Sequence, residues 1–321
     1  MTVEEIFNLA IGEGIQADPR GDKEVKKILS NNKREFEELP KKKKDEYDQE
    51  KFYNPYSDSR ILTGDRKRKV RRVLVGIDID SSEVILAKEL ERMGKPIDLI
   101  IAHHPEGKAL ARLHEVMDIQ TAVLALSGVP ETIGEGVLRE RLEEVWRSIA
   151  PVNHYKSVMT AELLNIPMIN FHTPADNCVW NFVNLYIEKK KPRIVGEIVE
   201  VLKEIPEYRR ATELNAGPSI FAGGEKNRAG KIVVSGMTGG TSGSSKIYER
   251  MSHYGIGTEI AMHIREEDRR EAVKHYINIV IAGHIASDSL GMNLILDKFE
   301  EQGIEIVPCS GLIRESRVKK N

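Results

Sequence analysis

The chain has 321 residues, enough for about two domains, and its 31% charged and 40% hydrophobic residues are typical of a globular protein with a charged surface. The 48 Lys and Arg nearly balance the 50 Asp and Glu, so the net charge of -2 disfavours nucleic acid and anionic membranes as partners. Cys178 and Cys309 cannot build a disulfide framework, and the N-terminus lacks a signal-peptide pattern, so we expect a cytoplasmic protein. The apolar runs, such as 277–283, are far shorter than the roughly 20 residues that span a bilayer.

Residues 1–69 differ in composition from the rest of the chain. They are dense in charges of both signs, with a few apolar residues at helical spacing, and the four lysines at 41–44 are followed at once by acidic residues. We therefore predict a charged helical N-terminal extension over 1–69, exposed to solvent. Its last part, from residue 54, contains Pro, Ser, Asp and Gly and is predicted to be a loop that enters the main domain.

From residue 70, short apolar runs alternate with amphipathic helices. A strand over 70–77, a helix over 82–93 and a strand over 96–102 form a βαβ unit, the signature of a parallel sheet. Further strands are expected at 167–171, 231–237, 258–264, 277–283 and 304–310. The predicted fold class is α/β, with two α/β domains that contain mixed, largely parallel sheets and with ligands bound at the carboxyl ends of the strands, in the cleft between the domains.

Histidines follow three of the predicted strands. The strand over 96–102 ends in His103 and His104, the strand over 167–171 ends in His172, and the strand over 277–283 ends in His284. Asp176 and Asp288 stand four residues after His172 and His284, a spacing that places each pair on one face of a helix. Imidazole and carboxylate are the ligands expected for zinc, manganese or iron.

Each motif alone also has a structural explanation. The two neighbouring histidines can point to opposite faces of the sheet, and Asp176 and Asp288 can be ordinary carboxylates at a turn or a helix start. The coincidence of three such strand ends favours a site, because neighbouring strands would gather three imidazoles and two carboxylates. Five ligands are too many for one catalytic zinc with an open position and suit two metal ions with a bridging water.

This cluster requires the first and last parts of the chain to meet in one sheet. We therefore predict a discontinuous metal-binding domain, 70–179 with 276–321, and an inserted second α/β domain over 180–275.

The order of these motifs resembles the Nif-three-like family (NGG-one-interacting factor three), whose members are often labelled GTP cyclohydrolase I type 2 homologues. The resemblance runs from about residue 56 to 313 and rests on VLVGIDIDSSEVILAKEL, DLIIAHHPEG, NFHTPADN and IAGHIASDSLG. It implies two divalent metal ions per subunit, of zinc, manganese, iron, cobalt or nickel, and a homo-oligomer in the form of a hexameric ring. The implied metal ligands are His103, His104, Asp176, His284 and Asp288, with His172 at the lip of the site as an acid or base.

Two positions depart from the family's motifs. Asp288 stands where the family usually has Glu, so the carboxylate is one methylene shorter, and Pro174 stiffens the turn in HTPAD. The N-terminal seventy residues also exceed the shorter members of the family.

Other polar features are weaker candidates. The segment GMTGGTSGSS, 236–245, is either a structural turn or an anion-binding loop, and its lysine lies outside the Walker spacing. Asp78 and Asp80 follow the first strand and are candidates to orient a metal ligand. His263 has no partner in the sequence and is expected to be a packing or surface residue.

Two hypotheses on function follow. The first is a metal-dependent hydrolase in which a metal-bridged hydroxide attacks a small, nucleotide-like or phosphoester substrate, with His172 as the proton shuttle. The second is a non-enzymatic protein that uses the same site for metal binding, regulation or a scaffold.

Overall fold

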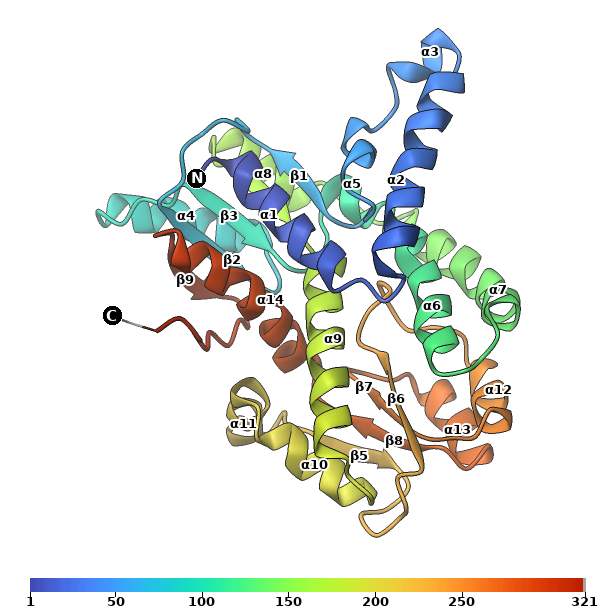
Figure 1. The fold of residues 1–321 in the computed structure, drawn as a ribbon. Coiled ribbons are helices and arrows are strands. Elements are labelled where there is room, and N and C mark those ends of the chain that lie inside the picture. Colours follow the sequence, from blue (N-terminus) through green and yellow to red (C-terminus); the bar gives the residue numbers. More distant parts are fainter. Residues whose placement is uncertain (320–321) are drawn as a thin grey trace.

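The computed structural model describes residues 1–319, which form two β-sheets joined by long helices (Figure 1). The first sheet has the strand order β1-β4-β3-β2-β9, and the second has the order β5-β8-β7-β6. Every neighbouring pair is parallel except β1 with β4 and β5 with β8, which are antiparallel edges. The predicted α/β class with mixed, largely parallel sheets is confirmed. The strands are β1 (Arg60–Thr63), β2 (Arg72–Gly76), β3 (Leu99–Ala102), β4 (Met168–Asn170), β5 (Ser219–Ala222), β6 (Lys231–Gly236), β7 (Ile256–Ala261), β8 (Asn278–Ile281) and β9 (Glu305–Cys309).

The predicted βαβ unit consists of β2, α4 (Ser81–Arg92) and β3. Asp80 and Glu83 form a reciprocal capping box that satisfies backbone N–H groups at the start of α4. All four residues of β3 are buried, as expected for a strand inside a parallel sheet that is covered on both faces.

Two long helices connect the sheets. Helix α9 (Thr173–Lys190) leads from β4 of the first sheet towards the second, and α14 (His284–Glu301) leads from β8 back to β9 of the first. The helices pack against each other so closely that a Cβ atom added to Gly291 would lie 2.3 Å from the carbonyl oxygen of Ala175. The first turns of α9 and α14 are thereby held side by side.

The position of strand β8 corrects the domain prediction. β8 pairs with β5 and β7, so the strand predicted at 277–283 lies in the second sheet and not beside β3 and β4. The hydrophobic pattern of the sequence could not show which sheet contains β8, because β8 is a fully buried apolar run like β3. The three strand ends still meet, since α14 returns the chain to the first sheet.

The predicted N-terminal extension contains core structure. Helix α1 (Val3–Gln16) is not exposed, because it packs on α9 with Val3, Ile6 and Phe7 fully buried. The predicted loop after residue 54 contains β1. Only α2 (Gly21–Glu38) and α3 (Lys41–Lys44) project away from the sheets as an exposed, charged arm (Figure 1).

The remaining helices cover the sheets. None of the helices in residues 1–319 combines the length and the apolar composition needed to cross a membrane. The helices not yet described are the 3-10 helices η1 (Gln49–Phe52) and η2 (Leu113–Asp118) and the α-helices α5 (Gly107–Leu110), α6 (Ile119–Leu126), α7 (Glu131–Ile149), α8 (Lys156–Leu163), α10 (Val195–Lys203), α11 (Pro206–Glu213), α12 (Ile247–His253) and α13 (Glu266–Lys274).

The contact between α9 and α14 gives a prediction on stability. Alanine in place of a helical glycine usually stabilises a protein by about 0.5–1 kcal/mol. Gly291→Ala should instead lower the free energy of unfolding by about 1–3 kcal/mol, because its methyl group has no space beside Ala175. Gly12→Ala in α1, where an added Cβ has no atom within 4 Å, is the control and should stabilise. Urea denaturation measures both, and a stabilised Gly291→Ala variant would contradict this packing.

Candidate metal centre

Six residues from three segments converge between the two sheets. His103 and His104 follow β3, His172 and Asp176 lie at the start of α9, and His284 and Asp288 occupy the first turn of α14. Three overlapping groups of these residues bring their ligand atoms within 4.8 Å of one another. All six residues predicted from the sequence therefore lie together.

Asp288 lies at the centre of this cluster. Its Oδ1 is 3.5 Å from Nε2 of His103, and its Oδ2 is 3.5 Å from Nε2 of both His104 and His284. The side chain is fully buried. The two carboxylate oxygens therefore face two different sets of imidazoles, and the shorter side chain of Asp reaches both.

Asp176 and His172 lie on one side of the cluster. Asp176 Oδ1 is 3.5 Å from His103 Nε2, and Asp176 Oδ2 is 3.7 Å from His172 Nε2. His172 is only 7% exposed, so it lies inside the cluster and not at its lip as predicted.

The cluster fits a metal ion because its inward-facing atoms have no hydrogen-bond partners. In the described part of the chain, both ring nitrogens of His103, both carboxylate oxygens of Asp288 and Oδ1 of Asp176 are buried without one. Orphaned buried polar groups are costly, so a native fold retains them where a ligand satisfies them. Ligand atoms about 2.1 Å from a tetrahedral ion lie about 3.4 Å apart, close to the separations here. These buried His and Asp groups can hold a metal ion.

Two further carboxylates fix the orientation of the histidines. His172 Nδ1 donates to Asp58 Oδ2 at 2.8 Å, and His104 Nδ1 donates to Asp78 Oδ1 at 2.7 Å. Each bond leaves the Nε2 atom of the ring directed at the cluster, the arrangement common to metal-binding histidines. The hydrogen bond to His104 thus supports the predicted role of Asp78 in orienting a metal ligand. Asp80 instead caps α4 and pairs with Lys156.

Asp58 is a site residue that sequence reasoning missed. It is completely buried just before β1 and also accepts hydrogen bonds from the hydroxyls of Ser59 and Thr173. No recognisable motif surrounds it in the sequence. The only signal was its place between two serines before a short apolar run, which is also typical of a turn.

The fold is similar to that of solved structures. No protein-family model matches the chain, and no curated protein matches it. A solved structure of a NIF3 superfamily protein from Sphaerobacter thermophilus is 27% identical and has a TM-score of 0.70, with 80% of this chain and 92% of that chain covered. This likeness supports membership of the NIF3 superfamily.

Two other solved structures are more distant. Reduced HcgD from Methanocaldococcus jannaschii is 14% identical, with a TM-score of 0.46 and 77% of this chain and 87% of that chain covered. A Bacillus cereus protein related to NIF3 is 11% identical, with a TM-score of 0.42 and coverage of 82% and 93%.

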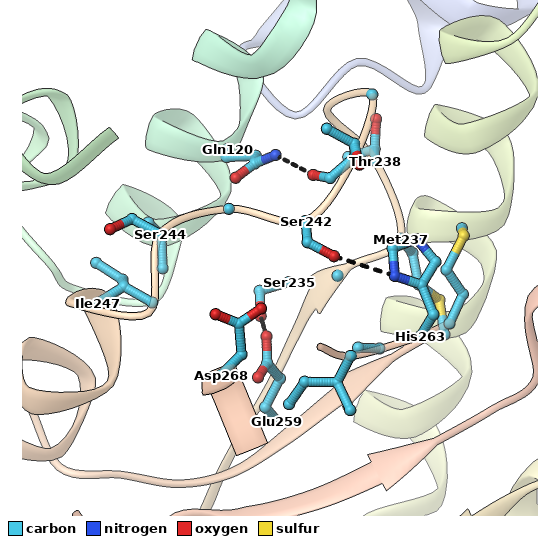
Figure 2. A pocket seen from close by; sticks show the side chains of 18 of the residues that line it. Gln120, Ser235, Met237, Thr238, Ser242, Ser244, Ile247, Glu259, His263 and Asp268 are labelled. Atoms are coloured by element: carbon cyan, nitrogen blue, oxygen red, sulfur yellow. Dashed lines mark hydrogen bonds between the residues drawn. The ribbon is translucent and has the colours of Figure 1, made fainter. Parts of the chain in front are cut away.

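A pocket adjoins the candidate metal centre. His172, Asp176 and His284 line it. Residues of the Gly-rich segment 236–245, among them Met237 and Ser242, also line it (Figure 2). Gln120 fixes that segment by donating to the carbonyl oxygens of Gly239 and Thr241. The segment therefore lines the pocket beside the cluster.

His263 also borders this pocket, although the sequence gave it no partner. Its ring centroid is 4.8 Å from that of His284, and its Nδ1 is 3.2 Å from the hydroxyl of Ser242. The expectation of a packing or surface residue is thus corrected, because His263 borders the site. The strand predicted over 258–264 included His263, whereas β7 ends at Ala261, so its place at a strand end was missed.

The protonation states in the metal-free protein follow from burial and neighbouring charges. Burial lowers the pKa of His103 to about 4, so its ring is neutral, and burial raises the pKa of Asp176 to about 7. Burial opposes the charge on His104, but Asp288 and Asp78 outweigh it and raise its pKa to about 10. The surrounding imidazoles hold the pKa of Asp288 well below its usual range despite burial. His104 must therefore lose a proton before its ring can bind a metal ion.

The bond to Asp58 gives a prediction on pH. Burial lowers the pKa of His172, but Asp176 and Asp58 outweigh burial and raise it. In chelator-treated protein, Asp58→Asn should lower the pKa of His172, whereas the exposed Asp65→Asn should not change it. The protonated ring stabilises the fold below its ordinary pKa near 6.5, and this contribution is lost as pH rises through the raised pKa. NMR titration of the imidazole protons measures the shift, and an unchanged value in Asp58→Asn would contradict the assignment.

Proposed function

We propose that this protein is a metal-dependent hydrolase that holds two divalent ions and acts on a small, nucleotide-like or phosphoester substrate. The observation that carries the proposal is the buried carboxylate of Asp288, whose two unpartnered oxygens face different ligand sets. One ion would be held by His103, Asp176 and Asp288, and the other by His104, His284 and Asp288. This donor set suits zinc, manganese, iron, cobalt or nickel.

The ions would supply an activated water and stabilise the negative charge that develops on the substrate. His172 is proposed as the proton shuttle, because its Nδ1–H is bound to Asp58 and its Nε2 faces the cluster. Asp58 orients the ring and favours its protonated form, so the same nitrogen can accept a proton and later donate it to the leaving group. The buried position of His172 keeps bulk water from competing for that proton.

Metal analysis tests the assignment of the ligands. Wild-type protein should bind two ions per chain, and His284→Ala should bind one, since it disrupts one ligand set only. Asp288→Asn should lose both ions, because each set includes one of its oxygens. His275→Ala, which lies outside the cluster, is the control and should bind two. If Asp288→Asn retains both ions, the assignment fails.

Turnover separates the hydrolase from a metal-binding scaffold. We expect the metal-loaded protein to cleave one or more of p-nitrophenyl phosphate, bis-p-nitrophenyl phosphate and an amino-acid p-nitroanilide. His172→Gln should retain its metal and lose about 100-fold or more in kcat. Loss of metal in this variant would show that His172 is a metal ligand, since His172 also forms a group with His103 and His104. Full metal content without turnover of any probe would favour the scaffold.

The resemblance to ring-shaped hexamers and the cytoplasmic location stay predictions. Neither is needed for the roles proposed for the six site residues.

A further inference from the structure

The pocket beside the candidate metal centre has a second group of polar residues. Besides His172, Asp176 and His284, its lining includes Glu259 of β7, Ser235 of β6 and Tyr248 of α12, and the cavity is about 90 Å³. Glu259 and Ser235 are labelled in Figure 2. Pockets for whole drug-sized ligands usually have about 300–1,000 Å³. The enclosed part is therefore suited to one small group of a larger molecule.

Glu259 is a buried carboxylate without a cationic partner. Its side chain is held by two neutral hydroxyls, since Tyr248 donates to Oε2 at 2.8 Å and Ser235 donates to Oε1. Glu259 is 7% exposed and takes part in no ion pair within residues 1–319. Buried carboxylates in proteins are normally paired with a cation or a metal ion.

The buried position of Glu259 is unfavourable for a charged carboxylate without a partner. Burial raises the pKa of Glu259, an energetic cost that a ligand with N–H donors would offset. The two hydroxyls fix the direction of the carboxylate and leave one further lone pair on each oxygen. A planar group with two N–H donors matches such a carboxylate, as the guanidinium of Arg does in proteins.

A further acidic residue, Asp268, lies in the pocket lining beside Glu259 and Asp176. Asp268 lines the cavity and is paired with Arg265, which does not line it. The lining contains no Lys or Arg, and apolar surface comes from Met251, Ile247 and Met237. An anion placed at this end would meet Glu259 without a compensating cation, so the pocket disfavours it.

We propose that this pocket is the specificity site for a basic or N–H-donating nitrogen group of the substrate, such as an amidine or an amino-substituted heterocycle. Glu259 accepts the N–H bonds, and Ile247 and Met251 contact the apolar part of the group. Because residues of the candidate metal centre line the same pocket, the bond to be cleaved would extend from this group towards them. The statement that the bound molecule is a substrate rests on the proposed hydrolase function. The preference of the pocket for an N–H-donating group does not.

A series of matched probes tests the pocket by calorimetry. Benzamidinium, benzamide and benzoate share one shape and are a cation, a neutral amide and an anion. Wild-type protein should bind benzamidinium most tightly, benzamide more weakly and benzoate least. Glu259→Gln should weaken benzamidinium binding by roughly tenfold or more, because a charged hydrogen bond is lost. Glu249→Gln on α12, outside the pocket lining, is the matched control and should bind benzamidinium as the wild type does.

Two further variants keep the result interpretable. Ile247→Trp should block all three probes by filling the cavity, even if Glu259→Gln proves unstable. Asp288→Asn, which should lose the metal ions, should still bind benzamidinium saturably, so that a failed metal site and a failed pocket give different results. The proposal is overturned if benzamidinium does not bind saturably, if benzoate binds Asp288→Asn as tightly as benzamidinium does, or if Ile247→Trp leaves benzamidinium binding unchanged.

Discussion

The close packing of α9 on α14 is the contact on which the candidate site depends. Asp176 lies in the first turn of α9 and Asp288 in the first turn of α14, so the distance between these carboxylates is set by how near the helices approach. Gly291 allows that approach, because any larger residue would meet the carbonyl oxygen of Ala175. The two carboxylates are thus held near each other in a buried interior, where a bound cation would offset the cost of their burial.

Much of the site could be predicted from the sequence, because its ligands lie at strand ends. A buried strand is recognisable as an apolar run, and a histidine directly after it has a defined place at the edge of a sheet. His103, His104 and His284 were found in this way, and helical spacing added Asp176 and Asp288. These inferences are local, so they hold although one of the strands belongs to the second sheet.

The rest depended on long-range contacts that a local pattern does not contain. An apolar run such as β8 fits either sheet, and only its pairing with β5 and β7 decides. Helix α1 reads as part of a charged extension, yet its one apolar face covers α9. The partners that bring Asp58 and His263 to the site are distant in the sequence: Asp58 is 114 positions from His172 and reaches it only in the fold.

Anomalous diffraction from crystals of the metal-loaded protein tests the central claim most directly. Data recorded at the absorption edge of the bound metal should show two peaks. One should lie between His103, Asp176 and Asp288, and the other between His104, His284 and Asp288. A single peak, or peaks away from Asp288, would contradict a pair of ions that share this carboxylate.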